Sequence, residues 1–254
     1  MDSAALSGLR DGRPRHRYIL KTKPDAKIGV LYQNDDYGKD YVKGLRAGLG
    51  EKALQIVVQV SYELADPTID SQIVQLKAAG IDTLIEQSSA KAAAQAIRKA
   101  HELDWHPLHI IGASTASLET VLKPAGLDAS KGLVTTQFLK QPGDPAWADD
   151  DEVKAYKNFL AKYAPSTNPD DYSVLVAYMN VNALTTVLRK CGDQLTRDNL
   201  IRQATSLHGE RMPMMLPGIA VSTTSEDYAP FKALRIATFD GTSWTLSGDP
   251  IAAE

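Results

Sequence analysis

The sequence has little that could cross-link the chain, anchor it or give it a strong charge. Cys191 is the only cysteine, so the chain can form no internal disulfide and holds no cysteine-rich metal site. No apolar run approaches the roughly 18 residues that a membrane-spanning helix needs. Lysine and arginine (28) nearly balance aspartate and glutamate (31), and the net charge of −3 excludes a general basic surface for nucleic acid. The 254 residues, 43% of them apolar, have the composition of an ordinary globular chain with a sizeable core.

The first 17 residues differ in character from the rest. Residues 1–17 are polar and rich in arginine, glycine and proline, and they contain no apolar stretch that would mark a secretory signal. We interpret them as a disordered or non-native tail. A basic arm for nucleic acid is the alternative, but the segment has no lysine and no interleaved aromatic residue. Regular patterning begins at Tyr18.

Between residues 18 and 139, short apolar strands alternate with amphipathic helices. The expected strands are 26–32, 54–60, 83–85, 108–111 and 132–138, and the expected helices are 39–52, 68–79, 90–103 and 118–122. Apolar strands separated by helices indicate a parallel sheet that is covered on both faces. We therefore predict an α/β fold, a doubly wound parallel sheet of five strands in the common order 2-1-3-4-5.

The pattern changes after Leu139. A Pro/Gly-containing linker at 140–145 leads into a mainly helical segment, residues 140–211, and then into a closing segment, residues 212–254. The expected helices are 152–163, 172–191 and 196–206, and a hairpin is expected about Asp240-Gly241. The acids at 149–152 are expected to be a solvated helix start. Three helices without strands of their own form an incomplete unit, and their exposed faces favour a homodimer.

Ligands of open parallel sheets bind beyond the carboxyl ends of the strands, where the strand order reverses. The loops expected there carry the candidate ligand-binding residues Tyr37, Ser88, Ser89, Ser114 and Thr115. Ser89 opens a helix, whose free N–H groups could hold a carboxylate. Two interpretations stay open for Ser89, a helix cap alone or a cap that also contacts ligand. Tyr37 likewise either packs at a turn or presents its ring and hydroxyl to a ligand.

Signatures of catalysis and of metal binding are lacking. The sequence contains neither a Walker A motif nor a G-x-S-x-G nucleophile elbow. His101, His106 and His109 do not have the spacing of a metal-binding helix pair. Asp35-Asp36 could start a phosphoacceptor site, but the third strand ends in Glu86-Gln87-Ser88 without the aspartate that such a site needs. The sequence therefore predicts a protein that is not an enzyme and that uses no metal and no cofactor.

Several segments resemble one family in their order and spacing. They are residues 27–41 (with IGVLYQNDDYGKDY as the core), 94–100 with Trp105, 123–127, 216–219 and 239–241. From about Tyr18 to Ile251 the chain resembles type I periplasmic binding proteins, in particular the branched-chain amino-acid (Leu/Ile/Val-binding) group of ABC-transporter solute receptors. The resemblance implies that residues 18–139 are the second lobe, and that 140–211 return to complete a first lobe whose N-terminal part is not visible here.

The resemblance also implies a function. Family members bind a small molecule between two lobes, close about hinge strands, here at Gln137 and Phe138, and present the closed form to an ABC permease in the membrane. It implies a periplasmic location and a ligand contact from Tyr37. The family's acidic partner for a ligand ammonium has no match at 113–115, which favours a small organic or aromatic carboxylate over a plain amino acid. A ligand-sensing regulatory domain of the same fold is the alternative, and an α/β enzyme is third.

Overall fold

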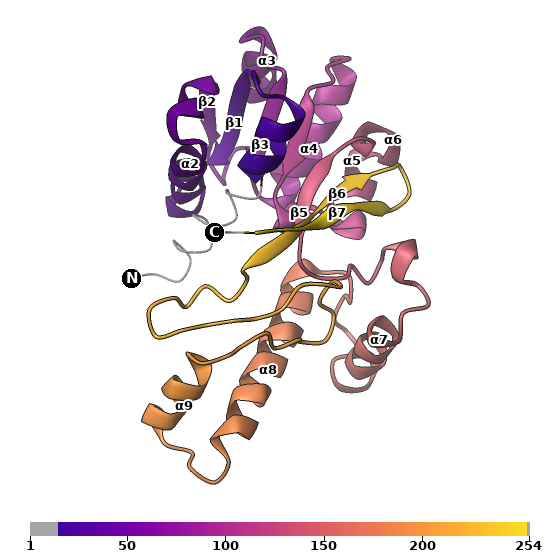
Figure 1. Ribbon diagram of the computed structural model, residues 1–254. Helices are drawn as coiled ribbons and strands as arrows, with labels where there is room; N and C mark the ends of the chain where they lie inside the picture. Colours follow the sequence, from indigo (N-terminus) through magenta and orange to yellow (C-terminus); the bar gives the residue numbers. More distant parts are fainter. Residues whose placement is uncertain (1–14, 253–254) are drawn as a thin grey trace.

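The chain is organised around one seven-stranded sheet (Figure 1). The computed structural model describes residues 15–252. The strand order is β2-β1-β3-β4-β5-β6-β7; the first five strands are parallel, and β6 and β7 run antiparallel to their neighbours. The strands are β1 (Ile28–Gln33), β2 (Ile56–Tyr62), β3 (Thr83–Gln87), β4 (Leu108–Ile111), β5 (Val134–Gln137), β6 (Ala233–Phe239) and β7 (Trp244–Ala252).

The first five strands have the predicted order, which confirms the doubly wound α/β fold. The hairpin of β6 and β7 forms where Asp240-Gly241 predicts it, but it also extends the sheet beside β5, so that the sheet has seven strands and not five. Thr135 of β5 pairs with Ala237 of β6, about a hundred residues further along the chain. A local turn signal specifies a hairpin but carries no information about so distant a partner, and this explains the difference.

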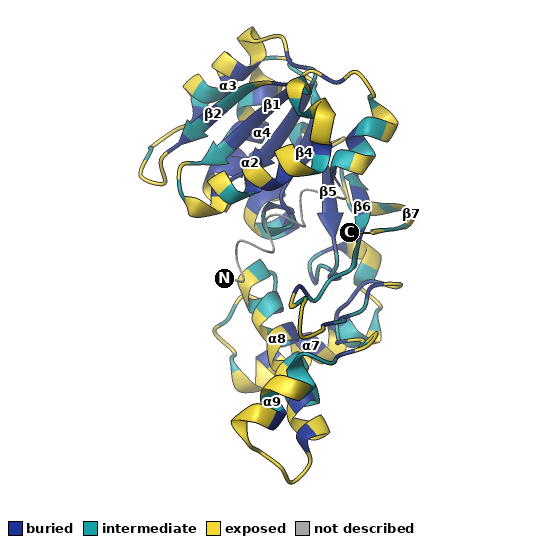
Figure 2. Cartoon of the chain, turned by 60° about the vertical axis from the view of Figure 1, so that its left-hand side comes forward, coloured by how far each residue is buried: buried dark blue, intermediate teal, exposed yellow. Residues whose placement is uncertain are grey.

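Helices cover both faces of the sheet, and Figure 2 shows the buried strands between helices with exposed outer faces. On one face, α2 (Asp36–Leu49) and the helix at residues 15–22 pack through Tyr41, Leu45 and Ile19. On the other face lie α3 (Asp70–Ala78), α4 (Ala90–Glu102), η3 (Leu118–Leu122) and α5 (Lys123–Ala125), with α6 (Leu127–Ser130) beside them. Short turns η1 (Gly50–Gln55) and η2 (Ala113–Thr115) follow α2 and β4.

The helix at residues 15–22 corrects the expected tail at its end. Residues 15–17, assigned to a disordered or non-native tail, are helical, and the Arg15 side chain is completely buried. Ile19, one turn later, is also fully buried and packs against α2 and the sheet. Residues 15–17 are polar and have no apolar periodicity, so the sequence pattern does not predict that this segment is helical or that Arg15 is buried. Residues 1–14, the rest of the expected tail, lie outside the described residues.

Residues 138–232 form a mainly helical block below the sheet in Figure 1. Its helices are η4 (Pro145–Trp147), α7 (Asp151–Tyr163), α8 (Tyr172–Cys191) and α9 (Arg197–Ala204), and Thr196 caps α9 as predicted. Between 140 and 211, all of it described, the chain forms no strand beyond an isolated bridge at Glu210. Val181, Leu184 and Leu188 of α8 are exposed. No helix within residues 15–252 combines the length and apolar character needed to cross a bilayer.

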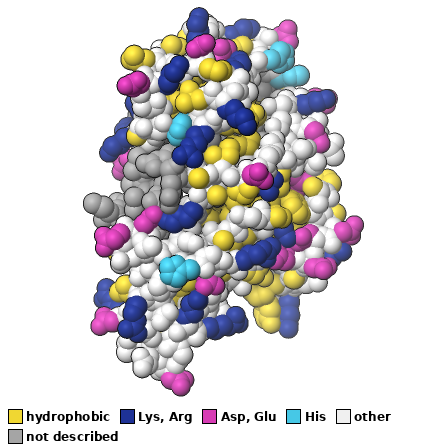
Figure 3. Space-filling model, viewed as in Figure 1, with side chains coloured by type: hydrophobic (Ala, Val, Ile, Leu, Met, Phe, Trp, Pro, Cys, Tyr) yellow, Lys and Arg dark blue, Asp and Glu magenta, His cyan; other side chains and the backbone are white. Residues whose placement is uncertain are grey.

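Two chain segments lie side by side where the helical block meets the α/β lobe, which comprises residues 15–137 and 233–252. Leu139 forms a β-bridge with Met215. The N–H of Lys140 donates to the carbonyl of Met214 (2.7 Å), and the N–H of Leu216 donates to the carbonyl of Phe138 (2.9 Å). We call this paired segment, residues 138–140 and 214–216, the crossing. Apolar side chains gather near the middle of the face in Figure 3, where the two parts meet.

Candidate functional site

The polar loops expected to bind a ligand lie at one edge of the sheet. β1, β3 and β4 are parallel neighbours, so their carboxyl ends meet at this edge. The strand order also reverses here, because β2 lies on the other side of β1 from β3. The edge is therefore the topological switch point at which open α/β sheets bind ligands.

Tyr37 reaches this edge from the first turn of α2. Asp35 caps the helix by accepting a hydrogen bond from the N–H of Gly38 (2.9 Å). A Cβ on Gly38 would lie 2.0 Å from the carbonyl oxygen of Gln33, so only glycine fits this tight turn. Tyr37 is 45% exposed, and its hydroxyl lies 3.4 Å from Ser114 Oγ. The structure thus brings together two of the candidate residues from different loops.

Ser88 and Ser89, which follow β3, are used differently. Ser89 is the N-cap of α4 and accepts from the N–H of Ala92 (3.4 Å), while its own N–H donates to Tyr62 Oη (2.7 Å). Ser88 is buried, and its hydroxyl donates to the carboxylate of Glu86. Ser89 therefore caps α4 at the carboxyl end of β3, whereas the buried Ser88 side chain bonds to Glu86.

Ser114 and Thr115 lie on the η2 turn after β4. Ser114 is half-buried and close to Tyr37, but Thr115 is buried and donates to the carbonyl of Gly112 (3.1 Å). A Cβ on Gly112 would come within 3.2 Å of Gln87 Oε1 and 3.5 Å of Ser114 Oγ. The missing side chain at Gly112 lets these polar groups converge.

Two residues at this edge were not among the sequence candidates. Gln87, the last residue of β3, donates through Nε2 to Tyr37 Oη and accepts at Oε1 from Arg15 Nη1 (3.3 Å). A polar residue at the end of an apolar strand is a signal that could have identified Gln87. Arg15 carries no such signal, since it belongs to a polar segment far from β3 in the sequence.

Beneath the edge, Glu86 and His109 form a buried pair. His109 Nε2 lies 2.7 Å from Glu86 Oε2, and both side chains are buried. His106 instead pairs with Asp104 at the surface (2.8 Å). Within residues 15–252, no three histidine, cysteine, aspartate or glutamate side chains gather in a way that could hold a metal ion.

The two expected hinge residues lie where the α/β lobe passes into the crossing. Gln137 ends β5, and Phe138 packs against Phe231 with ring centroids 4.4 Å apart. A small pocket at this point is lined from the lobe by Ala113 and Gln137 and from the helical block by Tyr172 and Leu175. Gln137 is 5% exposed, and its Nε2 is buried without a protein hydrogen-bond acceptor. Gln137 thus holds an unsatisfied amide donor at the junction of the two parts.

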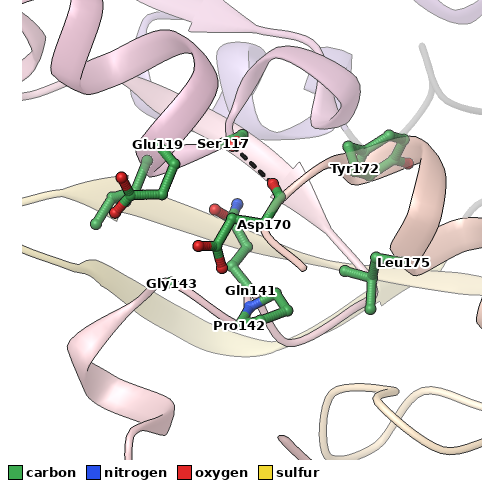
Figure 4. Close-up of a pocket in the computed structure, with 9 residues that line it drawn as sticks. Ser117, Glu119, Gln141, Pro142, Gly143, Asp170, Tyr172 and Leu175 are labelled. Atoms are coloured by element: carbon green, nitrogen blue, oxygen red, sulfur yellow. Dashed lines mark hydrogen bonds between the residues drawn. The ribbon is translucent and has the colours of Figure 1, made fainter. Parts of the chain in front are cut away.

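A second pocket shares Gln141, Tyr172 and Leu175 with the first and is drawn in Figure 4. Glu119 enters it from η3 and Asp170 from the loop before α8. Burial raises the pKa of Asp170, and the carboxylate atom Oδ1 has no hydrogen-bond partner. This pocket is acidic, in contrast to the hydroxyl and amide groups around Tyr37.

The acids at 149–152 start α7 as expected, and Asp149 is exposed to solvent, but Asp150 and Glu152 are also paired with cations. The buried Lys140 Nζ contacts Asp150 (2.6 Å) and Glu152 (2.9 Å), and Arg211 also binds Glu152. Hydrogen bonding to Arg211, together with Lys140, lowers the pKa of Glu152 to about 2. We call Lys140, Asp150, Glu152 and Arg211 the clasp. It ties the first turn of α7 to both segments of the crossing.

The sequence and the fold were compared with known proteins. A sequence model of the family described as periplasmic binding protein matches residues 12–243. Leu/Ile/Val-binding protein homolog 7 of Brucella suis biovar 1 (strain 1330) is 25% identical over 173 residues, or 67% of this chain and 42% of the relative.

Solved structures show the same fold. A branched chain amino acid ABC transporter protein from Thermus thermophilus with bound valine has a TM-score of 0.79 and 18% identity, and the match covers 96% of this chain and 65% of that one. An ABC-transporter solute binding protein from R. palustris in complex with benzoate has a TM-score of 0.72 and 16% identity, with 96% and 64% covered.

The chain therefore spans about two fifths of the length of this curated relative and about two thirds of these solved structures. The relatives and structural neighbours are solute-binding proteins and not enzymes, as predicted. The family match covers most of the chain, and the sheet order and the polar switch-point edge agree with it. The chain belongs to the periplasmic binding protein family.

Proposed function

We propose that the chain belongs to an extracytoplasmic receptor that binds a small carboxylate for an ABC importer. The ligand would lie between the switch-point edge of the α/β lobe and the start of α8. Ala113 and Gln137 of the lobe and Tyr172 of α8 line one pocket, which supports a site to which both parts contribute. In this proposal residues 18–139 are one lobe, 140–211 belong to the other, and 212–254 close the chain.

The donor chemistry of the edge carries the proposal. The hydroxyls of Tyr37 and Ser114 lie close together there, and α4 starts after the neighbouring strand β3; hydroxyl and N–H donors suit an anionic acceptor. The loop 113–115 has no acid to neutralise an ammonium group. Valine and benzoate, the ligands in two similar structures, both carry a carboxylate, and only benzoate lacks the ammonium. A small organic or aromatic carboxylate fits the edge best.

A thermal melt of this chain with a ligand panel tests the proposal. The panel is benzoate, aliphatic carboxylates, leucine, valine and the neutral analogue benzamide. A ligand at about 100 times its Kd adds roughly 2.7 kcal/mol of stability, so the melting temperature should rise with a carboxylate. A Tyr37→Ala variant, mutated at an exposed side chain, should melt as the unmodified chain does but lose the rise.

The outcomes separate the alternatives. A rise with benzoate and not with leucine supports the carboxylate receptor. Binding of leucine or valine with benzoate inactive refutes the carboxylate assignment but keeps a receptor. A cooperative melt that no compound on the panel moves contradicts ligand binding by this chain.

An amino-acid-like ligand is the second candidate, and Asp170 favours it. Its carboxylate atom Oδ1 is buried without a partner in a pocket that adjoins the one at Gln137, and a ligand ammonium would supply the missing hydrogen bond. If valine binds, Asp170→Asn should abolish that binding and leave benzoate unaffected. An unchanged valine affinity in Asp170→Asn rules out this role for Asp170.

An ABC permease partner and a periplasmic location are part of the same proposal. They rest on the family and on similar proteins described as ABC-transporter components. Fractionating cells that express the natural gene separates this proposal from the alternative, a ligand-sensing regulatory domain. Recovery in the periplasmic fraction supports a receptor, and recovery only in the cytoplasm supports the sensor.

We also propose that two copies can pair through α8. Val181, Leu184 and Leu188 are exposed at spacings of three and four residues, which places them on one face of the helix. Sedimentation of the chain should show a dimer that Leu184→Lys disrupts. A monomer at all concentrations contradicts the pairing.

A further inference from the structure

The side chain of Arg15 connects helix 15–22 to the candidate site. It is fully buried, donates from Nε and Nη2 to Thr136 Oγ1 (3.2 and 3.0 Å), and donates from Nη1 to Tyr41 Oη (2.7 Å). These contacts hold the guanidinium between β5 and α2. From there Nη1 also reaches Gln87 Oε1, at 3.3 Å.

Arg15 fixes which way the amide of Gln87 points. A guanidinium has only donors, so the group of Gln87 that faces it must be the carbonyl oxygen. The NH₂ group of the same amide then faces Tyr37 and donates to its hydroxyl oxygen. Gln87 is 4% exposed, so burial also restrains its rotation. Because the guanidinium of Arg15 donates to one end of the amide, the other end donates to the phenol of Tyr37.

This arrangement determines the role of the Tyr37 hydroxyl. Its oxygen accepts from Gln87, so its single proton is directed away from Gln87, and Ser114 Oγ lies on the accessible side at 3.4 Å. We propose that Arg15, acting through Gln87, sets the Tyr37 hydroxyl as a hydrogen-bond donor to the ligand and so makes the site select anionic acceptors. Arg15 and Gln87 are positioning residues here, and the inference rests on the proposed function.

Gln87→Glu reverses this direction with little change of shape. A carboxylate at 87 pairs with Arg15 but has no proton to donate, so Tyr37 turns its own proton toward it and offers the ligand only an oxygen. Benzoate affinity should fall roughly tenfold to hundredfold, while benzamide affinity stays within about twofold. Gln95→Glu is the matched control, since it makes the same charge change on α4, where the side chain of Gln95 donates to the carbonyl of Pro67. It should change neither affinity.

We call the chain of hydrogen bonds from Arg15 through Gln87 to Tyr37 the relay. A double-mutant cycle separates its effect from direct repulsion between benzoate and the new charge at residue 87. In a Tyr37→Phe background the relay has no hydroxyl to act on, so Gln87→Glu should have little further effect on benzoate affinity. An undiminished effect in that background overturns the relay. Arg15→Lys, which keeps a donor-only group, should retain the preference for benzoate over benzamide, and Arg15→Met should reduce it. Equal preferences in Arg15→Lys and Arg15→Met would also overturn it.

A measurement without ligand tests the same arrangement if none of the probes binds. The side-chain NH₂ of Gln87 gives its own pair of signals in a ¹H–¹⁵N spectrum. Tyr37→Phe should change the chemical shift of the NH₂ proton that faces the phenol. Arg15→Met should bring the chemical shifts of both NH₂ protons toward those of a glutamine side chain that is free to rotate. If both variants leave the Gln87 signals in place, the relay is wrong, whether or not the chain is a receptor.

Discussion

The contact between Gly38 and the backbone of Gln33 fixes how the chain leaves β1. A Cβ at residue 38 would lie 2.0 Å from a carbonyl oxygen, which is backbone and cannot rotate away. The same turn places Tyr37 at the switch point, so fold and site depend on one glycine. The Tyr37-Gly38 pair in the sequence therefore reflects the close approach of residue 38 to the backbone of Gln33.

We predict that Gly38→Ala destabilises the chain by about 1 to 3 kcal/mol, because the added methyl group must push the turn apart. Urea unfolding measures the change. Lys39→Ala, one position later on the exposed side of α2, should change stability by less than about 0.5 kcal/mol. Equal stabilities for Gly38→Ala and the unmodified chain would contradict the tight turn.

Single residues also show how far the site could be predicted from the sequence. Tyr37, Ser89 and Ser114 reach the predicted edge because strand ends and helix starts are readable locally. The burial of the Ser88 side chain follows from Glu86, whose position depends on the packing of β3. Arg15 was unpredictable, since its partners within residues 15–252 lie 26 to 121 residues away. Long-range polar contacts leave no periodic pattern.

At the scale of elements, α4 offers a test of the two interpretations of Ser89. Ser89→Ala should lower stability by about 1 kcal/mol, and Ser89→Gly by only a few tenths, because glycine is tolerated as an N-cap. If the hydroxyl also contacts a ligand, both variants should weaken benzoate binding to the same extent. Calorimetric titration compares the affinities. Unchanged affinity in both variants would show that Ser89 is a cap alone.

The clasp connects α7 to the crossing and makes that connection depend on pH. Because Arg211 and Lys140 lower the pKa of Glu152 in the folded chain to about 2 from an ordinary 4.5, the ionised carboxylate stabilises the fold. This contribution is complete above about pH 4.5 and is lost as the pH falls toward 2.

We therefore predict that Glu152→Gln lowers the free energy of unfolding by about 1 to 3 kcal/mol at pH 6 and by much less near pH 3. Urea unfolding at the two pH values measures the difference. Asp149→Asn removes an exposed acid that pairs only with Lys154, and it should have little effect at either pH. A loss in Glu152→Gln that is equal at both pH values would exclude the clasp as its cause.

Elements were more predictable than their connections. Each βα unit has its own apolar period, and the helix after β1 formed within three residues of its expected bounds; the cap predicted at Thr196 also formed, whereas the cap at Asp35 was not predicted. The addition of β6 and β7 to the same sheet was not predicted, because a strand pattern does not identify its partner. Asp144 contributes to this placement by accepting from the N–H of Trp244 (2.9 Å), a contact across a hundred residues.

For the whole molecule, the α/β lobe and the helical block meet at the crossing and at the two pockets. Most of the lobe's apolar contacts stay within it, whereas the helical block has a core of its own built around Met214, Met215 and Leu216. Parts with cores of their own suit motion of one against the other. We propose that such a motion turns near the ring contact of Phe138 and Phe231.

If the chain closes on its ligand, its overall size should decrease on binding. We predict that the radius of gyration of the unmodified chain, measured by small-angle X-ray scattering at saturating benzoate, falls below that of the ligand-free chain. The reason is that a ligand contacting both Tyr37 and the start of α8 stabilises only the closed arrangement. Tyr37→Ala under the same conditions should keep the larger radius. A radius that stays constant while calorimetry shows benzoate bound would mean that the site lies within the α/β lobe alone and that the crossing is not a hinge.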